Sequence, residues 1–114
     1  MSAPISKGNA PHYVWGADCD GWRLVDRGEL SVIHERMPAG RREVRHWHGR
    51  SRQFFFVLAG TLTLEVAGVG HKLQVGEGLE IDPETAHQAI NQSGFPVEFL
   101  VISHPTTTGD RHPA

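Results

Sequence analysis

The sequence is short of the features that mark secreted and membrane proteins. It contains a single cysteine, Cys19, so an intrachain disulfide is excluded, and a lone thiol is typical of a reducing compartment. Its first residues, MSAPISKGNAPHYVWG, lack the basic segment and the apolar run of a signal peptide. The longest apolar run, around 54–59, is too short to span a membrane. We therefore expect a cytoplasmic protein without a membrane-spanning segment.

An excess of positive charge is also absent. The formal net charge is −2 at pH 7, which argues against a nucleic-acid partner. With 39% hydrophobic and 21% charged residues, the composition is that of a folded protein rather than a disordered or fibrous one. A length of 114 residues suits a single domain with one modest core.

Long helical patterns are missing, and short strand-like runs take their place. The chain is broken into short pieces by 13 glycines and 7 prolines. Strands are predicted over 22–26, 29–37, 43–48, 53–59, 61–66, 71–75, 79–81, 87–91 and 97–103. The arm before them can add another strand, because Tyr13 and Trp15 alternate, and the polar tail after 103 is expected to fray at the surface. This pattern predicts an all-β sandwich or closed barrel.

Two histidines in one predicted strand suggest a metal site. His46 and His48 are two residues apart, so in a strand they share a face. Gln53 opens the next strand, and its amide lies beside the histidines if that strand pairs with 43–48. His87 begins another short strand after a proline-containing loop. An isolated His-x-His is more often a pair of exposed side chains, but three imidazoles and one amide oxygen suit a single cation.

The spacing of these residues resembles the two motifs of the cupin superfamily. The first motif is Gly, five residues, His-x-His, three or four residues, Glu, six residues and Gly. The second is Gly, five residues, Pro-x-Gly, two residues, His, three residues and Asn. The matching positions are Gly40, His46, His48, Gln53 and Gly60 in the first motif and Gly76, His87 and Asn91 in the second. The resemblance implies a double-stranded β-helix, or jelly-roll barrel, over 29–103, with 1–28 as an N-terminal arm and 104–114 as a C-terminal tail.

The resemblance also implies a divalent transition metal bound by the three histidines. Gln53 is then either a ligand or a group that orients a metal-bound water, and Fe, Zn, Ni, Mn and Cu all suit imidazole and amide donors. The sequence departs from the family where Gln53 replaces Glu and where Asp82 and Glu84 replace the Pro and Gly of the second motif. Because glutamine brings no negative charge, the ion would keep its full double charge. That change favours Lewis-acid chemistry over redox cycling.

By resemblance, the protein is an enzyme that acts on a small oxygen-rich or acidic organic molecule. Two chemistries compete: dioxygenation, which is the commoner use of a three-histidine cupin site, and Lewis-acid isomerisation, cyclisation or decarboxylation. A non-catalytic ligand-binding or sensor cupin is the alternative from another class. The sequence offers no strong general base, because the alternation does not show where Glu80, Asp82 and Glu84 point.

Side chains near the motifs suggest the pocket and a partner surface. Phe55 and Val57 are predicted to line the interior near the metal, with Phe99 joining them from the last strand. Phe54 and Phe56 then face the other way, either against a second subunit in a homodimer or under the N-terminal arm.

Five arginines lie close to the first motif, within residues 41–52: Arg41, Arg42, Arg45, Arg50 and Arg52. We interpret them as a solvated turn. The alternative is a positive rim that steers an anionic substrate.

Overall fold

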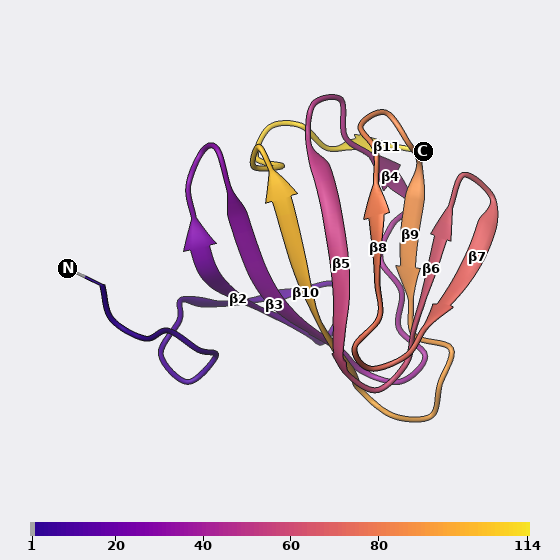
Figure 1. The fold of residues 1–114 in the computed structure, drawn as a ribbon. Coiled ribbons are helices and arrows are strands. Elements are labelled where there is room, and N and C mark those ends of the chain that lie inside the picture. Colours follow the sequence, from indigo (N-terminus) through magenta and orange to yellow (C-terminus); the bar gives the residue numbers. More distant parts are fainter. Residues whose placement is uncertain (1) are drawn as a thin grey trace.

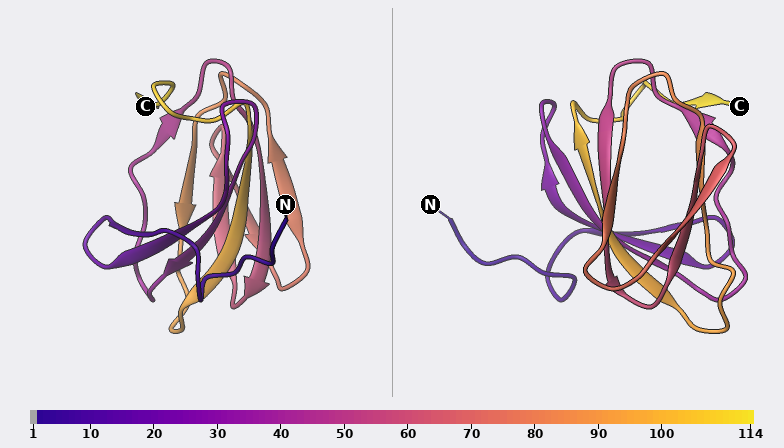
Figure 2. Two further views of the ribbon diagram at one scale, coloured as in Figure 1. Left: turned by 90° about the vertical axis from the view of Figure 1, so that its left-hand side faces the viewer. Right: turned by 45° about the vertical axis from the view of Figure 1, so that its right-hand side comes forward.

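The computed structural model describes residues 2–114, which fold into two facing antiparallel sheets (Figures 1 and 2). The larger sheet contains, in spatial order, β1 (His12–Trp15), β2 (Cys19–Asp26), β3 (Ser31–Met37), β10 (Val97–His104), β5 (Arg52–Ala59) and β8 (Gly78–Ile81). The smaller sheet contains, in spatial order, β11 (His112–Pro113), β4 (His46–Trp47), β9 (His87–Ile90), β6 (Leu62–Val66) and β7 (Val69–Leu73). The all-β jelly-roll prediction is therefore confirmed. Within residues 2–114 no helix has the length and apolar character that a membrane crossing needs.

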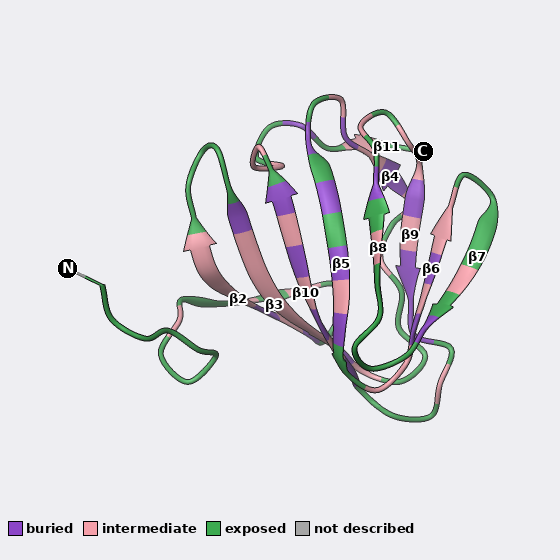
Figure 3. Ribbon diagram, in the orientation of Figure 1, coloured by how far each residue is buried: buried purple, intermediate pink, exposed green. Residues whose placement is uncertain are grey.

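Alternating side chains form the core between the sheets. In β10 the burial alternates along the strand, with Val97, Phe99 and Val101 inward (Figure 3). They pair with β5 in a register that places Phe99 beside Val57 and Val101 beside Phe55. Leucines of the smaller sheet close the core from the other side, because successive strand side chains point to opposite faces.

Two local features fix the corners of the barrel. The β6–β7 hairpin turns at Ala67 and Gly68, whose φ angles of 50° and 87° are those of the two-residue turn that suits twisted strands. At the end of β9, the buried Asn91 amide donates hydrogen bonds to the carbonyl oxygens of Met37, Pro38 and Phe95. Asn91 therefore satisfies backbone groups.

The strand that carries the first two histidines differs from the prediction. The sequence predicts a strand over 43–48, but β4 contains only His46 and Trp47. It pairs with β9 and β11 in the smaller sheet, and not with the strand that contains Gln53. Residues 43–45 are not part of a strand, and Val44 is exposed while His46 is buried. Gln53 lies on β5 in the opposite sheet.

The C-terminal tail also differs from the prediction, because it is built into the fold rather than frayed. His112 and Pro113 pair with β4, and the ring of His112 stacks on Trp47 with centroids 4.3 Å apart. The side chain of Asp110 is buried and accepts hydrogen bonds from the backbone of residues 49–51. Figure 1 shows the β4–β5 loop, the β8–β9 loop and β11 at one end of the molecule.

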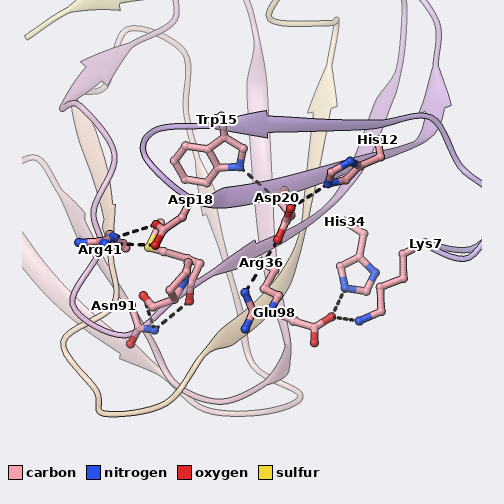
Figure 4. A network of polar contacts seen from close by, with 12 residues as sticks. Lys7, His12, Trp15, Asp18, Asp20, His34, Arg36, Arg41, Asn91 and Glu98 are labelled. Atoms are coloured by element: carbon pink, nitrogen blue, oxygen red, sulfur yellow. Dashed lines mark hydrogen bonds and ion pairs between the residues drawn. The ribbon is translucent and has the colours of Figure 1, made fainter.

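Polar contacts tie the N-terminal segment to the larger sheet (Figure 4). Lys7 and His34 both reach Glu98 of β10, at 2.6 and 2.7 Å. The indole of Trp15 donates to the carbonyl oxygen of Asp20, which closes the β1–β2 hairpin. Strands β1 and β2 thereby extend the larger sheet on the side away from β8.

The outer face of the larger sheet carries an apolar strip on β5 and β10. Phe54 is 37% exposed and its ring stacks on that of Phe56, with centroids 6.2 Å apart. Their cross-strand neighbours on β10 are Ile102 and Leu100. Two strands, β3 and β10, separate β5 from the aromatic residues of β1 and β2, which argues against cover by those aromatic residues.

Candidate metal centre

Three histidines that are distant in sequence meet between the sheets. His46 and His87 are cross-strand partners in β4 and β9, and His48 follows β4 directly. Their ring centroids are 4.8 Å apart for His46–His48, 4.5 Å for His46–His87 and 5.4 Å for His48–His87. Each ring offers one nitrogen to a set of atoms that all lie within 4.8 Å of one another. Such a cluster can hold one cation.

Hydrogen bonds fix which nitrogen each ring presents. The Nδ1 atoms of His46, His48 and His87 lie 2.7, 2.9 and 2.9 Å from the carbonyl oxygens of Val44, Asp110 and Thr85. A carbonyl oxygen can only accept, so each Nδ1 carries the proton and donates it. Each Nε2 then keeps a free lone pair, which is the form that coordinates a metal.

Three buried atoms at the cluster have no hydrogen-bond partner among the described residues: His48 Nε2, His87 Nε2 and Gln53 Oε1. Gln53 comes from the opposite sheet, and its Nε2 donates to Ser103 Oγ at 3.1 Å, which leaves Oε1 free. Burying a polar atom without a hydrogen-bond partner costs free energy, so the three unpaired atoms need one common explanation. All three are metal-ligating atoms, and the donor set therefore fits a divalent transition metal.

The surroundings keep the imidazoles neutral. Burial lowers the pKa of His46 to about 3 and also holds the pKa values of His48 and His87 below the usual range. At neutral pH all three rings are therefore uncharged and ready to donate a lone pair. Loss of solvation is the main cause in each case, so the same effect follows from any closely packed site of this kind.

The C-terminal segment and the β8–β9 loop hold the His48 region in place. The carboxylate of Asp110 accepts hydrogen bonds from the backbone N–H groups of Gly49, Arg50 and Ser51 at 2.8–3.0 Å, and these bonds lower its pKa to about 2. Across the site, the N–H of Glu84 donates to the carbonyl oxygen of His48 at 2.6 Å. Glu84 has a φ of 65°, a left-handed conformation that the glycine of the family motif would adopt more readily.

A cavity of about 210 Å³ opens beside the histidines. His46, His48 and Gln53 form part of its wall, together with Phe55. Val57 and Phe99, predicted to line this pocket, are fully buried in the core instead, while Val101 takes a place in the wall. The reason is depth along the strands, since Val57 pairs with Phe99 farther from Gln53.

The arginine-rich segment does not face this cavity. Arg41 pairs with Asp18, Arg45 with Glu65, and Arg52 with Asp82 at the surface, as a solvated turn requires. Two other arginines, Arg23 and Arg111, lie in the cavity wall. Neither arginine lies in a cluster of basic residues, so the sequence gives no indication that they line the cavity. In the structure, Arg23 pairs with Ile33 on β3.

Two glutamates in the cavity wall were also missed from the sequence. Glu43 accepts a hydrogen bond from the N–H of Ala89 at 2.8 Å, and burial raises its pKa to about 7. Burial and then the Glu43 carboxylate raise the pKa of Glu35 to about 8. The acidic residues considered from the sequence, Glu80, Asp82 and Glu84, are all exposed and lie outside the cavity wall. The sequence offered one indication of this role for Glu35, because its carboxyl occupies one of the inward positions of 31–37.

Comparison with known proteins is consistent with this geometry. Residues 33–103 match the family model for the cupin domain, Cupin_2. No curated protein sequence matches the chain. A sugar phosphate isomerase of the cupin superfamily from Silicibacter pomeroyi superimposes with a TM-score of 0.81 at 20% identity, over 91% of this chain and 76% of that one.

Two further solved structures have the same fold. A predicted oxalate decarboxylase from Thermotoga maritima gives a TM-score of 0.83 at 13% identity, over 91% of this chain and 100% of that one. The polyketide cyclase RemF from Streptomyces resistomycificus gives 0.83 at 15% identity, over 100% of this chain and 86% of that one. At such low identity these likenesses show the fold alone.

Proposed function

This chain belongs to the cupin family, and from that premise we propose that it is a metal-dependent enzyme using Lewis-acid chemistry. A divalent transition metal is held by His46, His48 and His87, with the amide oxygen of Gln53 beside them. The substrate is a small, oxygen-rich or acidic organic molecule that binds in the adjoining cavity.

One observation carries the proposal. Two imidazole nitrogens of the histidine cluster and the amide oxygen of Gln53, which shares a cavity wall with His46 and His48, are buried without a hydrogen-bond partner among the described residues. The other polar atom of each of these side chains forms a hydrogen bond. A structural role would be served equally well by apolar side chains, which would avoid the cost of these unpaired atoms.

Gln53 favours Lewis-acid chemistry over oxygenation. All four donors are neutral, because the histidines lose their charge through burial and the amide has none. When bound, a divalent ion would supply an undiminished positive charge that polarises a substrate carbonyl or carboxylate oxygen. Ser103 Oγ accepts from Gln53 Nε2, so the oxygen of the amide, rather than its nitrogen, is left free to act as a ligand.

The fold comparison supports the same chemical range. An isomerase, a predicted decarboxylase and a cyclase share this architecture, and isomerisation of a sugar phosphate and cyclisation of a polyketide can both pass through an enol or enolate. The cavity wall of this chain contains two arginines, Arg23 and Arg111, that suit an anionic substrate.

Elemental analysis and solvent exchange together test the proposal. The protein is loaded with zinc, nickel, manganese or iron, and incubated in D₂O with pyruvate or dihydroxyacetone. Proton NMR then follows deuterium entering at the carbon next to the carbonyl, which reports enolisation whatever the final product. We expect one bound ion per chain and exchange that is lost in a His87→Ala variant.

Other results would redirect the assignment. Iron-dependent oxygen consumption without exchange would identify a dioxygenase. Tight binding of small acids without any turnover would identify a ligand-binding or sensor protein. Failure to bind any of the four metals, with the fold intact by circular dichroism, would overturn the proposed metal centre.

A further inference from the structure

We propose that Glu35 is the catalytic acid–base of this site, the group that exchanges a proton with a substrate carbon. This role rests on the proposed function, because it needs a substrate at the three histidines. Glu35 belongs to β3 in the larger sheet, whereas the histidines belong to the smaller sheet or follow it directly. It shares one cavity wall with His46, His48 and Gln53.

The first argument is the position of Glu35 on the inner face of the sheet. It pairs with Gly21 on β2 and with Phe99 on β10. Phe99 is fully buried, which fixes this row as inward-facing. A carboxyl group in such a row is unusual, since charged groups are rarely buried without a partner.

The second argument is that Glu35 has no partner. Within residues 2–114 it is the one acidic residue that is not exposed and forms neither a hydrogen bond nor an ion pair. Glu43, its neighbour, is anchored by the N–H of Ala89. A structural carboxylate would be expected to have such an anchor, whereas a group that serves a substrate must stay free.

The third argument is that the fold places a second polar group, the hydroxyl of Tyr13, in the same cavity wall as Glu35. Tyr13 pairs with Gly21, and its ring lies where a side chain at residue 21 would be, in direct contact with the position of a Cβ atom. The glycine therefore lets the Tyr13 ring lie across β2 beside Glu35, in the same cavity wall. The guanidinium of Arg23 lies over this ring, at 4.5 Å from its centroid. Burial raises the pKa of Tyr13 to about 12, so its hydroxyl stays a hydrogen-bond donor.

The proton transfer is balanced without any further reactant. A carboxylate oxygen of Glu35 takes a proton from the carbon next to the substrate carbonyl, and the C–H electron pair forms the C=C bond of an enolate. The carbonyl π electrons move to the oxygen that faces the histidines. Return of the proton to the same or the neighbouring carbon restores Glu35. The raised pKa of Glu35 makes its carboxylate a stronger base than an ordinary glutamate.

Deuterium exchange into pyruvate separates this role from the proposed function. With zinc-loaded protein, Glu35→Gln should slow exchange by about 100-fold or more, the usual contribution of a general base. Glu35→Asp should retain an intermediate rate, and the control Glu29→Gln, an exposed glutamate without side-chain hydrogen bonds, should match the wild type. The wild-type rate should rise with pH as Glu35 loses its proton, and the glutamine variant should lack this rise.

A second measurement does not depend on turnover. Glutamate labelled with ¹³C at its carboxyl group is incorporated, and the Glu35 signal is assigned from its loss in Glu35→Gln. Oxalate, a planar dianion that resembles the enolate of pyruvate, is then added to the zinc-loaded protein. We expect the Glu35 resonance to move while that of Glu29 stays in place.

The outcomes are distinct. If the wild type and Glu35→Gln exchange equally and both lose activity with His87→Ala, the proposed function stands and the role of Glu35 is overturned. An unmoved Glu35 signal in the presence of bound oxalate also overturns it. If the wild type shows no metal-dependent exchange, the proposed function fails and the role of Glu35 fails with it.

Discussion

The unpaired carboxyl of Glu35 should make the stability of the metal-free protein depend on pH. Burial and the Glu43 carboxylate raise its pKa from 4.5 to about 8, while the Arg111 guanidinium opposes the shift. The neutral form is therefore favoured in the folded state. The resulting stability is fully present below pH 4.5 and is lost as the pH rises through about 8. Besides Glu43 and Arg111, the groups that surround Glu35 are Tyr13 and Cys19 on the neighbouring strands.

The size of this effect follows from the shift. One pKa unit corresponds to about 1.4 kcal/mol, so a shift from 4.5 to about 8 sets an upper limit of about 5 kcal/mol. Water that reaches the cavity screens the charge, and we expect about 2–4 kcal/mol. Glu35→Gln keeps the shape and removes the titration. At pH 5 the free energy of unfolding of the variant should therefore differ only slightly from that of the wild type. At pH 9 the variant should be the more stable protein.

Urea unfolding of the metal-free protein between pH 5 and pH 9 measures this difference. The matched control is Glu29→Gln, which removes an exposed carboxyl and should follow the wild type throughout. A difference between Glu35→Gln and the wild type that stays constant over this range would refute the reasoning, since it would mean that Glu35 is as well solvated as Glu29. A wild type that is the more stable protein at pH 9 would point to an ion pair absent from this structure.

Further predictions concern the metal centre, the loop beside it and the outer sheet. Gln53→Glu adds a negative charge at the free Oε1 position and should tighten zinc binding, whereas Gln53→Leu should weaken it; equal affinities by calorimetry would remove Gln53 from the site. Asp110→Ala releases three backbone N–H groups next to His48 and should weaken zinc binding about tenfold or more; unchanged affinity would contradict the supporting role. Glu84→Gly should raise the free energy of unfolding by about 0.5–1 kcal/mol, because it relieves a left-handed φ; a loss of stability would show that the side chain contributes more than its backbone strain costs. We also propose a homodimer through Phe54 and its neighbours, so Phe54→Arg should halve the mass measured by light scattering, whereas Val69→Arg should not; a monomeric wild type would exclude it.

Local pattern was enough to predict most of the strands and which residues of the long strands turn inward. β10 shows this most clearly, because its burial alternates over eight residues, and the burial of β5 alternates from Arg52 to Leu58. The motif spacing likewise placed His46, His48 and His87 in one neighbourhood, and the structure brings their rings together.

The contributions that were missed depend on contacts between distant segments. Asp110 supports His48 across 62 residues of sequence, and no local pattern indicates such a contact. Gln53 lies in the opposite sheet and shares a cavity wall with His46 and His48, an arrangement that strand pairing rules alone do not reveal. Glu35 stands among inward positions of β3, but only the Tyr13 ring packed over Gly21 and the missing partner distinguish it from a surface glutamate.

The origin of the four donor atoms has a practical consequence. His46, His48 and His87 belong to the layer around β4 and β9, and Gln53 to the layer around β5, so a bound ion would act as a clamp across the mouth of the barrel. At a free ion concentration of 100 times the dissociation constant, such a clamp adds about 2.7 kcal/mol to the folded state. Purification in the presence of a chelator would then yield a protein that melts earlier and opens first at this end. A melting temperature for this chain therefore has meaning only when the metal content of the sample is stated.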